Sequence, residues 1–548
     1  MVRRGMRSRL ISVLFLISLV FTMLVMAVGC QPGSGGRSPG AESGRITIGT
    51  TASLNTIDPA DATSSFAGLL QYNLCDRLYT YQLGSRDLVP QLATAMPQVS
   101  ADGLTYRIPL RQGVVYHDGT AFDAAAMAFS LQRFTQAGGN AASILGAIDQ
   151  VTATAPYELT IRLKEPFAAF PSLLAYAGAC AVSPKAYQIP AASEGEAKKF
   201  KPKELIGTGA YQLTDFGTDR LRLEIFDRYW GDKPQNQGID IQVFSSPANL
   251  FNAFRTGAVD LAIQGMATEQ VQTLQQQASG RGWKVLEQSG GSIDFLVMNV
   301  KSAPLDQLPV RQAIAALINR SILQSRVFLG QVEPLYSLIP NSFDVQKPTF
   351  KERFGDRNLE TAKTLLKQVG YSVQEPLVVD LWYRSNLVND QLAATTLKAD
   401  ANRELQGLVK FQLNSVETTT AYARLEQGLY PIFLLDWTGD YFDPDTYIYP
   451  FLECTEGSVQ TACKTGQSAA WGSFYYSDRA NQLLAQSRAA LDPAKRKQIF
   501  EQLQQLVAEE VPFIPLWQSK DYLFVQAAIE GASLEVTQKV PFRQLRRS

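Results

Sequence analysis

One uninterrupted apolar run, from Leu10 to Val28, restricts the fold of this chain more than any other feature. Four arginines precede the run, and a small residue, Gly29, follows it. A basic start, an apolar segment and a small residue before the cleavage point are typical of a secretory signal peptide. The run is also about long enough to span a bilayer, so an uncleaved N-terminal anchor is the alternative. Because no second apolar span follows in the sequence, we expect the rest of the chain to fold outside the membrane.

The residues at the end of the run resemble the bacterial lipobox, in which a cysteine is acylated and becomes the new N-terminus. Cys30 follows Val-Gly and precedes the soft stretch QPGSGGRSPGAESG, although Ala27 stands where the motif usually has leucine. The resemblance implies a signal peptide over 1–29, a lipidated Cys30 that anchors the chain to a membrane, and a flexible linker over 30–44. Cleavage before Cys30 would leave 47 basic and 51 acidic residues, so the mature protein would be mildly acidic.

The composition excludes several classes of function. A chain of 548 residues is longer than one hydrophobic core usually supports, so two or more lobes are expected. The 51 basic residues equal the 51 acidic ones in number and do not cluster downstream of the signal, which argues against a nucleic-acid partner. Histidine-based zinc sites need two or three histidines, and this chain has one. We therefore predict no metal site and no cofactor.

The single histidine, His117, lies in VVYHDGTAFDA, between a predicted strand and a predicted helix. Asp118 and Gly119 are typical of a turn, and Thr120 or Asp123 is suited to cap the helix that follows. Ser-His-Asp catalysis would depend on His117 alone, and the sequence contains no G-x-S-x-G element to supply a nucleophile. We predict a structural role for His117.

The other cysteines fit an oxidising compartment. Cys454 and Cys463 lie nine residues apart in a polar segment that contains glycine, FLECTEGSVQTACKTG. This spacing in an exported protein predicts a disulfide, with two unpaired thiols as the alternative. Cys75 and Cys180 have apolar neighbours, and we predict that they are buried small hydrophobic residues without a catalytic role.

The pattern along the chain alternates between strands and helices. Strands are predicted at ITIGTTASL, LTYRIPL, VTATAPYELTIRL, GAYQLTDFG, LRLEIF and IDIQVF, with a capped helix at TAFDAAAMAFSLQRF. The segment SSPANLFNAFRTGAVDLAIQG continues the last of these strands as a helix and a further strand. Later segments repeat the alternation, and a long helix ends in RKQIFEQLQQLVAEE before the strand VPFIPLWQ. This pattern predicts a mixed α/β protein with two α/β lobes and an inserted subdomain.

Five segments, in this order, resemble one protein family over almost the whole mature length. They are LVPQLATAMPQVSADGLTYRIPLRQGVVYHDGTAFDA, GTGAYQL, NLFNAFRTGAVDLAI, PVRQAIAALINRSIL and LLDWTGDYFDPDTYIYPFL. The family comprises the peptide-binding extracytoplasmic receptors of bacterial ABC importers, of the family 5 type, which bind dipeptides and oligopeptides. The resemblance implies a two-lobed flytrap fold, whose lobes are joined by hinge strands and close over a ligand. It also implies that the protein is not an enzyme.

The resemblance also divides the chain and implies its partners. Lobe I is expected over 45–86, 207–290 and 515–548, the inserted subdomain over 87–206, and lobe II over 291–514. The permease and the ATPase are expected on separate chains, because nothing in this sequence resembles a Walker loop or a domain with several membrane spans. We expect an exported monomer that is anchored to a membrane by lipid and binds a peptide.

A free peptide carries a positive and a negative end, so a receptor of broad specificity needs an acid for one end and a cation for the other. Asp440, in WTGD, matches the family aspartate that pairs with the peptide amino group; the alternative is a turn residue beside Gly439. Asp436 and Asp443 are weaker candidates. Arg384, in LWYRSNLVND, matches in register the arginine that binds the carboxylate in dipeptide-binding members. The alternative for Arg384 is a solvated residue after a strand.

Charge-assisted contacts of about 1.5–3 kcal/mol each do not reach micromolar affinity on their own, so aromatic burial is expected to contribute. Trp437 is the first aromatic candidate for ligand contact, followed by Trp382 and Tyr383, although ordinary core packing is the favoured interpretation for Trp382. Three other functions stay open. They are a receptor for a metal chelate, haem or another small solute, an exported hydrolase, and a structural or signalling surface protein.

Overall fold

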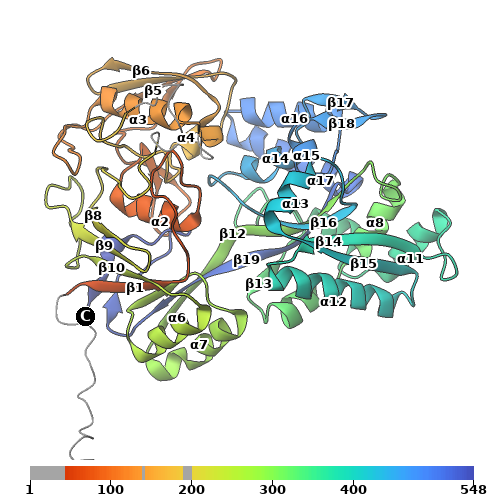
Figure 1. The fold of residues 1–548 in the computed structure, drawn as a ribbon. Coiled ribbons are helices and arrows are strands. Elements are labelled where there is room, and N and C mark those ends of the chain that lie inside the picture. The colour runs from red at the N-terminus through yellow and green to blue at the C-terminus, as the bar shows by residue number, and fades with distance from the viewer. Residues whose placement is uncertain (1–43, 139–141, 189–199) are drawn as a thin grey trace, which may run out of the picture.

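The computed structural model describes residues 44–138, 142–188 and 200–548. The predicted signal peptide over 1–29 and Cys30 lie outside these residues. The described chain confirms the predicted mixed α/β fold, and it is built around one large sheet (Figure 1). Its eleven strands are β1 (Ile46–Thr50), β8 (Tyr211–Phe216), β9 (Arg220–Ile225), β10 (Ile239–Val243), β11 (Leu261–Ile263), β12 (Lys284–Met298), β13 (Val332–Pro334), β14 (Leu377–Arg384), β15 (Val409–Val416), β16 (Ile432–Thr438) and β19 (Phe513–Val525).

The order of the strands separates the sheet into two halves. The path runs β15-β14-β16-β12-β19-β11-β1-β10-β9-β8, and β13 pairs with β19. In the first half, β14 is parallel to both β15 and β16, and in the second half β1 is parallel to both β10 and β11. The predicted strand–helix–strand segment forms β10, α6 (Pro247–Thr256) and β11. Ser246 caps α6 at its start, and Gly257 ends the helix in the left-handed conformation, with φ of 75°.

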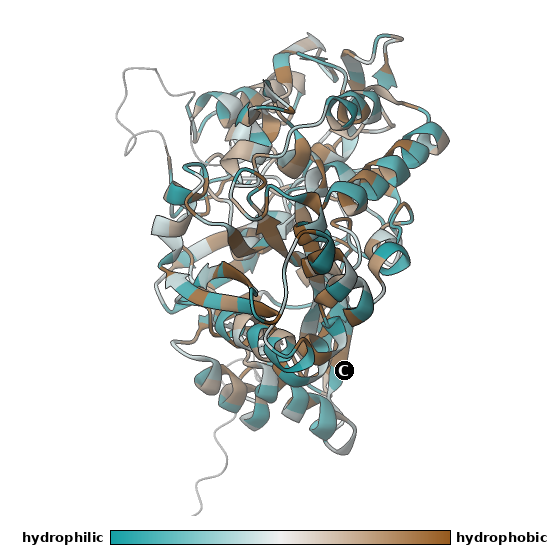
Figure 2. Ribbon diagram, turned by 90° about the vertical axis from the view of Figure 1, so that its right-hand side faces the viewer, coloured by the Kyte–Doolittle hydropathy of each residue, from teal (hydrophilic) through white to brown (hydrophobic). Residues whose placement is uncertain are grey.

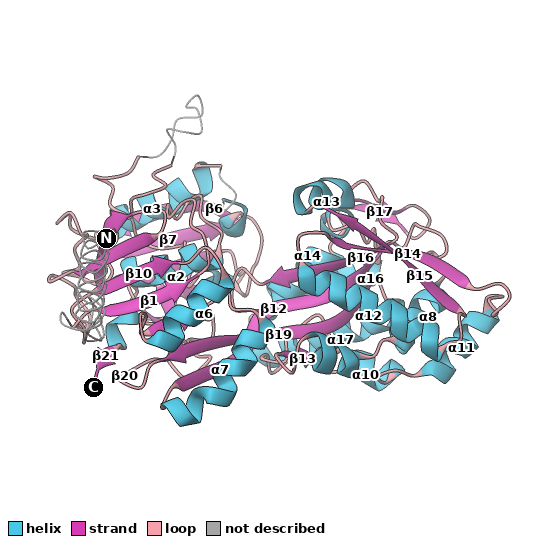
Figure 3. Cartoon of the chain, turned by 60° about the horizontal axis from the view of Figure 1, so that its bottom comes forward, coloured by secondary structure: helices cyan, strands magenta, loops and turns pink. Residues whose placement is uncertain are grey.

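Two long antiparallel strands, β12 and β19, belong to both halves of the sheet (Figure 3). The first part of β12 pairs with the end of β19 beside β11, whereas its last residues pair with both β19 and β16. The register between the two long strands shifts between Ser289 and Ile293, where three residues of β12 stand opposite Ser519. Such a bulge bends the strand locally and increases its twist. This bulge marks the place where one lobe passes into the other.

A second sheet builds the small subdomain at the top left of Figure 1. Its strands are β4 (Gln98–Val99), β5 (Thr105–Pro109), β7 (Glu158–Leu163) and β6 (Ile148–Ala155), in that spatial order. Helix α3 (Ala124–Gln136) contributes to the core of this subdomain, and its cap is Asp123, whose carboxylate accepts a hydrogen bond from the Ala126 N–H at 2.9 Å. Tyr106 and Phe170 meet edge to face at 4.9 Å within this core.

Helices cover the two halves of the sheet. Figure 2 shows hydrophobic strands inside the molecule and more hydrophilic residues on the outer helices. Lobe I, lobe II and the small subdomain each have a hydrophobic core, as expected for a chain of this length. None of the described helices is long and apolar enough to cross a membrane. The longer helices of the two lobes are α2 (Ser65–Leu74), α7 (Thr268–Arg281), α8 (Leu308–Leu317), α11 (Leu359–Gln368), α12 (Val388–Glu404), α13 (Thr418–Leu425), α16 (Asp478–Ala489) and α17 (Pro493–Glu510).

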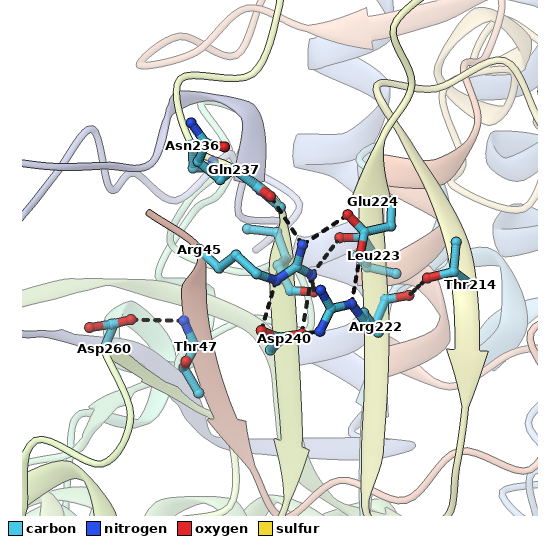
Figure 4. A network of polar contacts seen from close by, with 12 residues as sticks. Arg45, Thr47, Thr214, Arg222, Leu223, Glu224, Asn236, Gln237, Asp240 and Asp260 are labelled. Atoms are coloured by element: carbon cyan, nitrogen blue, oxygen red, sulfur yellow. Dashed lines mark hydrogen bonds and ion pairs between the residues drawn. The ribbon is translucent and has the colours of Figure 1, made fainter. Parts of the chain in front are cut away.

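A buried arginine fixes the first strand of lobe I (Figure 4). The Arg45 guanidinium donates to Asp240 at 2.8 Å and to Glu224 at 2.9 Å, and it also reaches the carbonyl of Leu223 at 2.9 Å. These contacts tie the start of β1 to its neighbour β10 and to the next strand, β9, because Asp240 lies on β10 and Glu224 on β9. These three strands of lobe I are therefore connected by side chains as well as by backbone hydrogen bonds.

The prediction for Cys75 and Cys180 was incomplete. Both cysteines are buried, as predicted, but they form a disulfide across 105 residues of sequence. The segment that carries Cys180 runs beside the end of α2, where the Ala181 N–H donates to the carbonyl of Asp76 at 2.9 Å. Only the tertiary fold brings the two thiols together. Cys454 and Cys463 form the other disulfide, between residues nine apart.

His117 has the environment of a structural residue. Its Nδ1 accepts from the Gly207 N–H at 3.3 Å, and its Nε2 donates to the carbonyl of Gly209 at 3.1 Å. The ring packs edge to face on Phe226 at 4.9 Å. Burial lowers the pKa of His117 to about 4, so the imidazole is neutral and holds the loop that enters β8.

Candidate functional site

Two cavities flank the bulge between the lobes. The larger has a volume of about 610 Å3 and the smaller about 140 Å3. Gln538 lines both, and neighbouring residues of the bulge, Ser292 and Gly291, line the larger and the smaller cavity respectively. We call the two cavities together the cleft. The cleft lies between the lobes beside the strands that join them, which is a common position for a ligand.

Asp440 lies in the smaller cavity, on the loop that follows β16. Trp437 Nε1 donates to the carbonyl of Thr446 at 2.8 Å, and the Thr446 hydroxyl accepts from the Asp440 N–H at 3.3 Å. The Tyr447 hydroxyl accepts from the Gly439 N–H at 3.3 Å and donates to the carbonyl of Gly291 in the bulge at 2.7 Å. Hydrogen bonds to Thr446 and Tyr447 therefore fix the loop, and Tyr447 links it to the bulge. The loop places the Asp440 carboxylate at the junction of the lobes.

The Asp440 carboxylate has no ion-pair partner among the described residues. Its side chain faces the cavity, but the surrounding protein limits its hydration and raises its pKa to about 6. Burial is the only cause of this shift, so no cation offsets it. At neutral pH this aspartate is a partly buried anion without a neighbouring cation. A cationic group of a ligand would therefore stabilise its charge strongly.

The same cavity holds one other acid and one cation. Lys539 lines the wall with its Nζ close to Gly68 of α2, and burial lowers the pKa of Lys539. Glu535 is buried, and its carboxylate accepts from the Thr537 N–H at 2.9 Å. Within the described chain, Lys539 Nζ has no ion pair within 4 Å.

Arg384 does not have the free guanidinium that its predicted role requires. It is 4% exposed at the end of β14, and its Nη2 and Nε donate to Asp390 Oδ2 at 3.0 and 3.2 Å. Its Nη1 forms an ion pair with Asp436 and a hydrogen bond to the Tyr422 hydroxyl at 3.4 Å. Two aspartates already pair with the guanidinium, and Arg384 lines the larger cavity, so its pairing with a ligand carboxylate stays a prediction. Arg384 and Asp440 also line different cavities.

None of the three aromatic side chains predicted to contact the ligand lines either cavity, and their contact with a ligand stays a prediction. Trp437 braces the Asp440 loop and packs against Trp471, with ring centroids 5.2 Å apart. Trp382 stacks at a tilt on Tyr430 at 4.9 Å, and Tyr383 packs against the lobe II core. The core interpretation favoured for Trp382 therefore holds. The aromatic residues that do line the smaller cavity are Tyr72, Tyr81, Tyr176, Tyr441, Phe442 and Tyr447.

Of the three other aspartates in the DWTGDYFDPD segment, Asp436 lines the larger cavity and pairs with Arg384, whereas the two later ones are structural. Asp443 accepts two hydrogen bonds from the Arg496 guanidinium, each of 2.7 Å. Asp445 is fully buried and pairs with Arg488 at 2.8 Å. Asp440 differs from both, because it points into a cavity and has no arginine beside it.

The sequence interpretation named Asp436 as a weaker candidate but missed the other three acids of the larger cavity. Asp294 lies on β12, Asp390 at the start of α12 and Asp521 on β19. Burial is the first cause that raises the pKa of each, to about 6 for both Asp390 and Asp521. An aspartate that interrupts an apolar strand, as in SIDFLVM or KDYLFV, is the signal that could have identified two of them. No cluster of three or more His, Cys, Asp or Glu residues in the described chain could hold a metal ion.

Contacts other than the joining strands also connect the lobes. The Tyr81 hydroxyl donates to the carbonyl of Phe442 at 3.2 Å. Arg86 forms an ion pair with Asp344 at 2.5 Å, and the Ala168 N–H reaches the carbonyl of Arg488 at 2.7 Å. These contacts join the first part of the chain and the small subdomain directly to lobe II, in addition to the strands that connect the lobes.

Comparisons with known proteins agree with this architecture. The model of one protein family, "Bacterial extracellular solute-binding proteins, family 5 Middle", matches residues 87–459 of this chain. The dipeptide-binding protein of Escherichia coli (strain K12) is 26% identical over 487 residues, covering 84% of this chain and 86% of the relative. HbpA2 from Haemophilus parasuis has a TM-score of 0.79 at 19% identity, covering 92% of this chain and 100% of that one.

A further solved structure is the ABC transporter-associated periplasmic binding protein DppA from Helicobacter pylori, in complex with the peptide STSA. It has a TM-score of 0.72 at 21% identity, covering 92% of this chain and 98% of that one. The match to the family extends over more than half of the chain. This chain therefore belongs to the bacterial extracellular solute-binding proteins of family 5, the substrate-binding components of ABC importers.

Proposed function

We propose that this protein captures short peptides outside the cytoplasm and delivers them to an ABC import permease. Relatives named for dipeptide binding and a neighbour solved with a peptide support this ligand class. The combined volume of the two cavities falls in the range of about 300–1,000 Å3 that is typical of small-molecule sites. The protein acts by binding and release, without catalysis.

The proposal rests on one observation: the Asp440 carboxylate lines the smaller cavity, is largely buried, and has no ion-pair partner among the described residues. A peptide amino group is a cation with several N–H donors, and it matches this carboxylate in both charge and hydrogen bonding. Burial raises the pKa of Asp440 and no cation of the described chain pairs with its carboxylate, so an ammonium group would gain a strong partner there. Lys539, in the same cavity, offers an ammonium for the peptide carboxylate in place of Arg384.

We further propose that the protein is exported and is lipid-anchored through Cys30. The basic and apolar start of the chain, followed by Val-Gly-Cys and a Gly/Ser/Pro linker, supports this placement. A lipid anchor on a flexible linker would hold the receptor near a membrane-bound permease, and the permease and ATPase would be separate chains. The receptor would work as a monomer, because each chain carries its own cleft.

Native mass spectrometry of the full chain in detergent, purified without refolding, tests the proposal. We expect bound masses that match short peptides. Asp440→Asn should weaken peptide binding by about tenfold to a hundredfold, the equivalent of one charge-assisted contact. Asp219→Asn, an exposed aspartate that lines neither cavity, is the matched control and should bind like the parent protein. A single bound mass that is not a peptide would refute the peptide assignment and leave the receptor assignment in place.

A further inference from the structure

The larger cavity is strongly acidic. Its lining includes four aspartates and two cations, which leaves two negative charges in excess. One of the cations, Lys520, is already paired with Glu287 at 2.7 Å, and Glu287 does not line the cavity. The other, Arg384, is held between Asp390 and Asp436. The acids of this cavity therefore outnumber the cations that can neutralise them.

Arg384 pairs with Asp390 and Asp436 but forms no ion pair with Asp294. Asp294 lies within the range of repulsion from Asp436 and Asp390, and burial together with this repulsion raises its pKa well above the usual value. Arg384 and a hydrogen bond from the Trp517 side chain offset only part of this effect. Among the described residues, Asp294 has no ion pair within 4 Å. A buried carboxylate of this kind costs free energy unless a further cation or a proton compensates for it.

Asp521 gives an independent indication, because it stands apart from the group around Arg384. It lines the cavity from β19, and its Oδ2 is buried and has no hydrogen-bond partner in the described part of the chain. The strand opposite carries Gly290, and a Cβ at that position would lie 3.0 Å from Asp521 Oδ2. The absence of a side chain there leaves room beside the carboxylate. Lys539 offsets part of the effect of burial on Asp521, but the two residues form no ion pair within 4 Å in the described chain. The buried carboxylate can therefore accept a cationic partner from a ligand.

The rest of the wall suits a particular kind of cation. Trp517 and Phe328 line the cavity with their rings 4.7 Å apart, and Met266, Leu387 and Val388 add apolar surface. The side chains of lysine and arginine combine an apolar stem with a cationic head, and they bury the stem while the head meets acids or aromatic faces. From this combination we infer that the larger cavity is a specificity pocket for a basic side chain of the bound peptide. The inference rests on the proposed peptide function and adds a ligand class to it.

Peptide pairs that differ by a single charge test the inference. The ligands are trialanine, its three variants with one lysine, and the three matching variants with norleucine, which keeps the stem without the ammonium. Binding to the full chain in detergent is measured by isothermal titration calorimetry. We expect one lysine peptide to bind at least tenfold more tightly than its norleucine counterpart. Equal affinities at all three positions would overturn the inference and leave the peptide function intact.

Two variants assign the preference to residues. Asp521→Asn and Asp294→Asn are near-isosteric, and each should lower the lysine-to-norleucine ratio at least threefold while trialanine binds as before. Asp440→Asn should weaken all seven peptides by a similar factor and leave the ratio unchanged. Thermal unfolding of each variant within about 2 °C of the parent establishes that the fold is intact. A lysine preference that survives both of the first two variants would refute the assignment to this cavity.

Spermidine separates failure of the inference from failure of the peptide function. It carries the cationic groups and apolar stem without a peptide backbone. Binding of spermidine that depends on Asp521, with no binding of any peptide, would support the cationic pocket and refute the peptide function. If neither spermidine nor any peptide binds, both proposals are wrong.

Discussion

Asp440 shows how one residue acquires its properties from the loop that carries it. The Asp440 N–H donates to the Thr446 hydroxyl and the Gly439 N–H donates to the Tyr447 hydroxyl, which holds the carboxylate at the cavity wall. Burial without a cation raises the pKa of Asp440 to about 6. A raised pKa means that the folded protein takes up a proton at this site as the pH falls toward 6. The protonated acid no longer attracts an ammonium group, so binding and protonation compete.

The competition predicts a pH dependence of peptide binding. Affinity for trialanine should be nearly constant from pH 6.5 to 7.5 and should fall as the pH drops through about 6, approaching tenfold per pH unit well below that value. Calorimetric titrations at four pH values between 4.5 and 7.5 measure the slope. In Asp440→Asn the slope should be lower by about one proton. An unchanged slope in that variant would show that another group controls the pH dependence.

Arg384 makes a different prediction, because its role in the structure is to neutralise buried acids. Arg384→Met would leave Asp294, Asp390 and Asp436 without a cation, and we expect a loss of about 3–5 kcal/mol in the free energy of unfolding at pH 8. The pKa of Asp390 is already raised to about 6, and loss of Arg384 would raise it further. Protonation at pH 5 should therefore remove part of the loss.

Urea unfolding of the parent and of Arg384→Met at pH 8 and pH 5 measures both values. Arg384→Lys is the control that keeps the charge and should lose less stability at pH 8. A loss that is equal at both pH values would contradict the electrostatic explanation.

At the scale of elements, β12 and β19 decide where the cleft forms. The bulge opposite Ser519 lies where the two strands leave one lobe and enter the other, and glycines occupy positions 290 and 291. The strand pattern of DFLVMNV and VPFIPLWQ predicted a strand at each place, because apolar residues with β-branched neighbours signal strands. The pattern contained no information on the bulge, which depends on the pairing of residues more than 200 positions apart.

Substitution by alanine should have opposite effects at Gly290, in the bulge, and at Gly280, in helix α7. In Gly290→Ala the new Cβ would overlap Ser519 Oγ and crowd Asp521, so we expect a loss of about 1–3 kcal/mol in stability. In Gly280→Ala, within α7, the new Cβ meets no atom within 4 Å, and a gain of about 0.5–1 kcal/mol is expected. Differential scanning calorimetry of the two variants compares them directly. A stabilised Gly290→Ala variant would show that the bulge can rearrange without cost.

At the scale of the whole molecule, the contacts between the lobes differ in exposure. The Arg86–Asp344 pair is exposed at both ends, whereas Tyr81 contacts Phe442 where both residues line the smaller cavity. An exposed ion pair contributes little free energy, so ligand contacts are expected to supply most of the free energy that holds the lobes together.

Removal of the exposed Arg86–Asp344 pair should therefore have a small effect that depends on salt. We expect Arg86→Ala to speed peptide dissociation less than about fivefold in low salt and to have no effect in 1 M salt. Stopped-flow displacement of a bound peptide measures the rate. Arg220→Ala removes an exposed pair with Asp215, within one lobe, and should leave the rate unchanged. Acceleration above tenfold would show that this pair dominates the contact between the lobes.

The sequence predicted the lobes and strands far better than the site. Capped helices, strand patterns and family segments are local, so the lobes and the Asp123 cap could be read from neighbouring residues. Arg384 was placed correctly at the end of a strand, but its partners Asp390 and Asp436 come from a different helix and strand. Which acids an arginine meets depends on tertiary packing, and the same reason explains why the pairing of Cys75 with Cys180 was missed.

The two disulfides have a consequence for biogenesis. In chain order the cysteines are Cys30, Cys75, Cys180, Cys454 and Cys463, and the native bonds join the second to the third and the fourth to the fifth. A chain that crosses a membrane from its N-terminus would present each pair in succession, so an oxidase acting on emerging thiols would form native bonds without later reshuffling. The one thiol that could intercept Cys75 belongs to Cys30. Acylation of Cys30 would therefore protect the pairing order as well as anchor the protein.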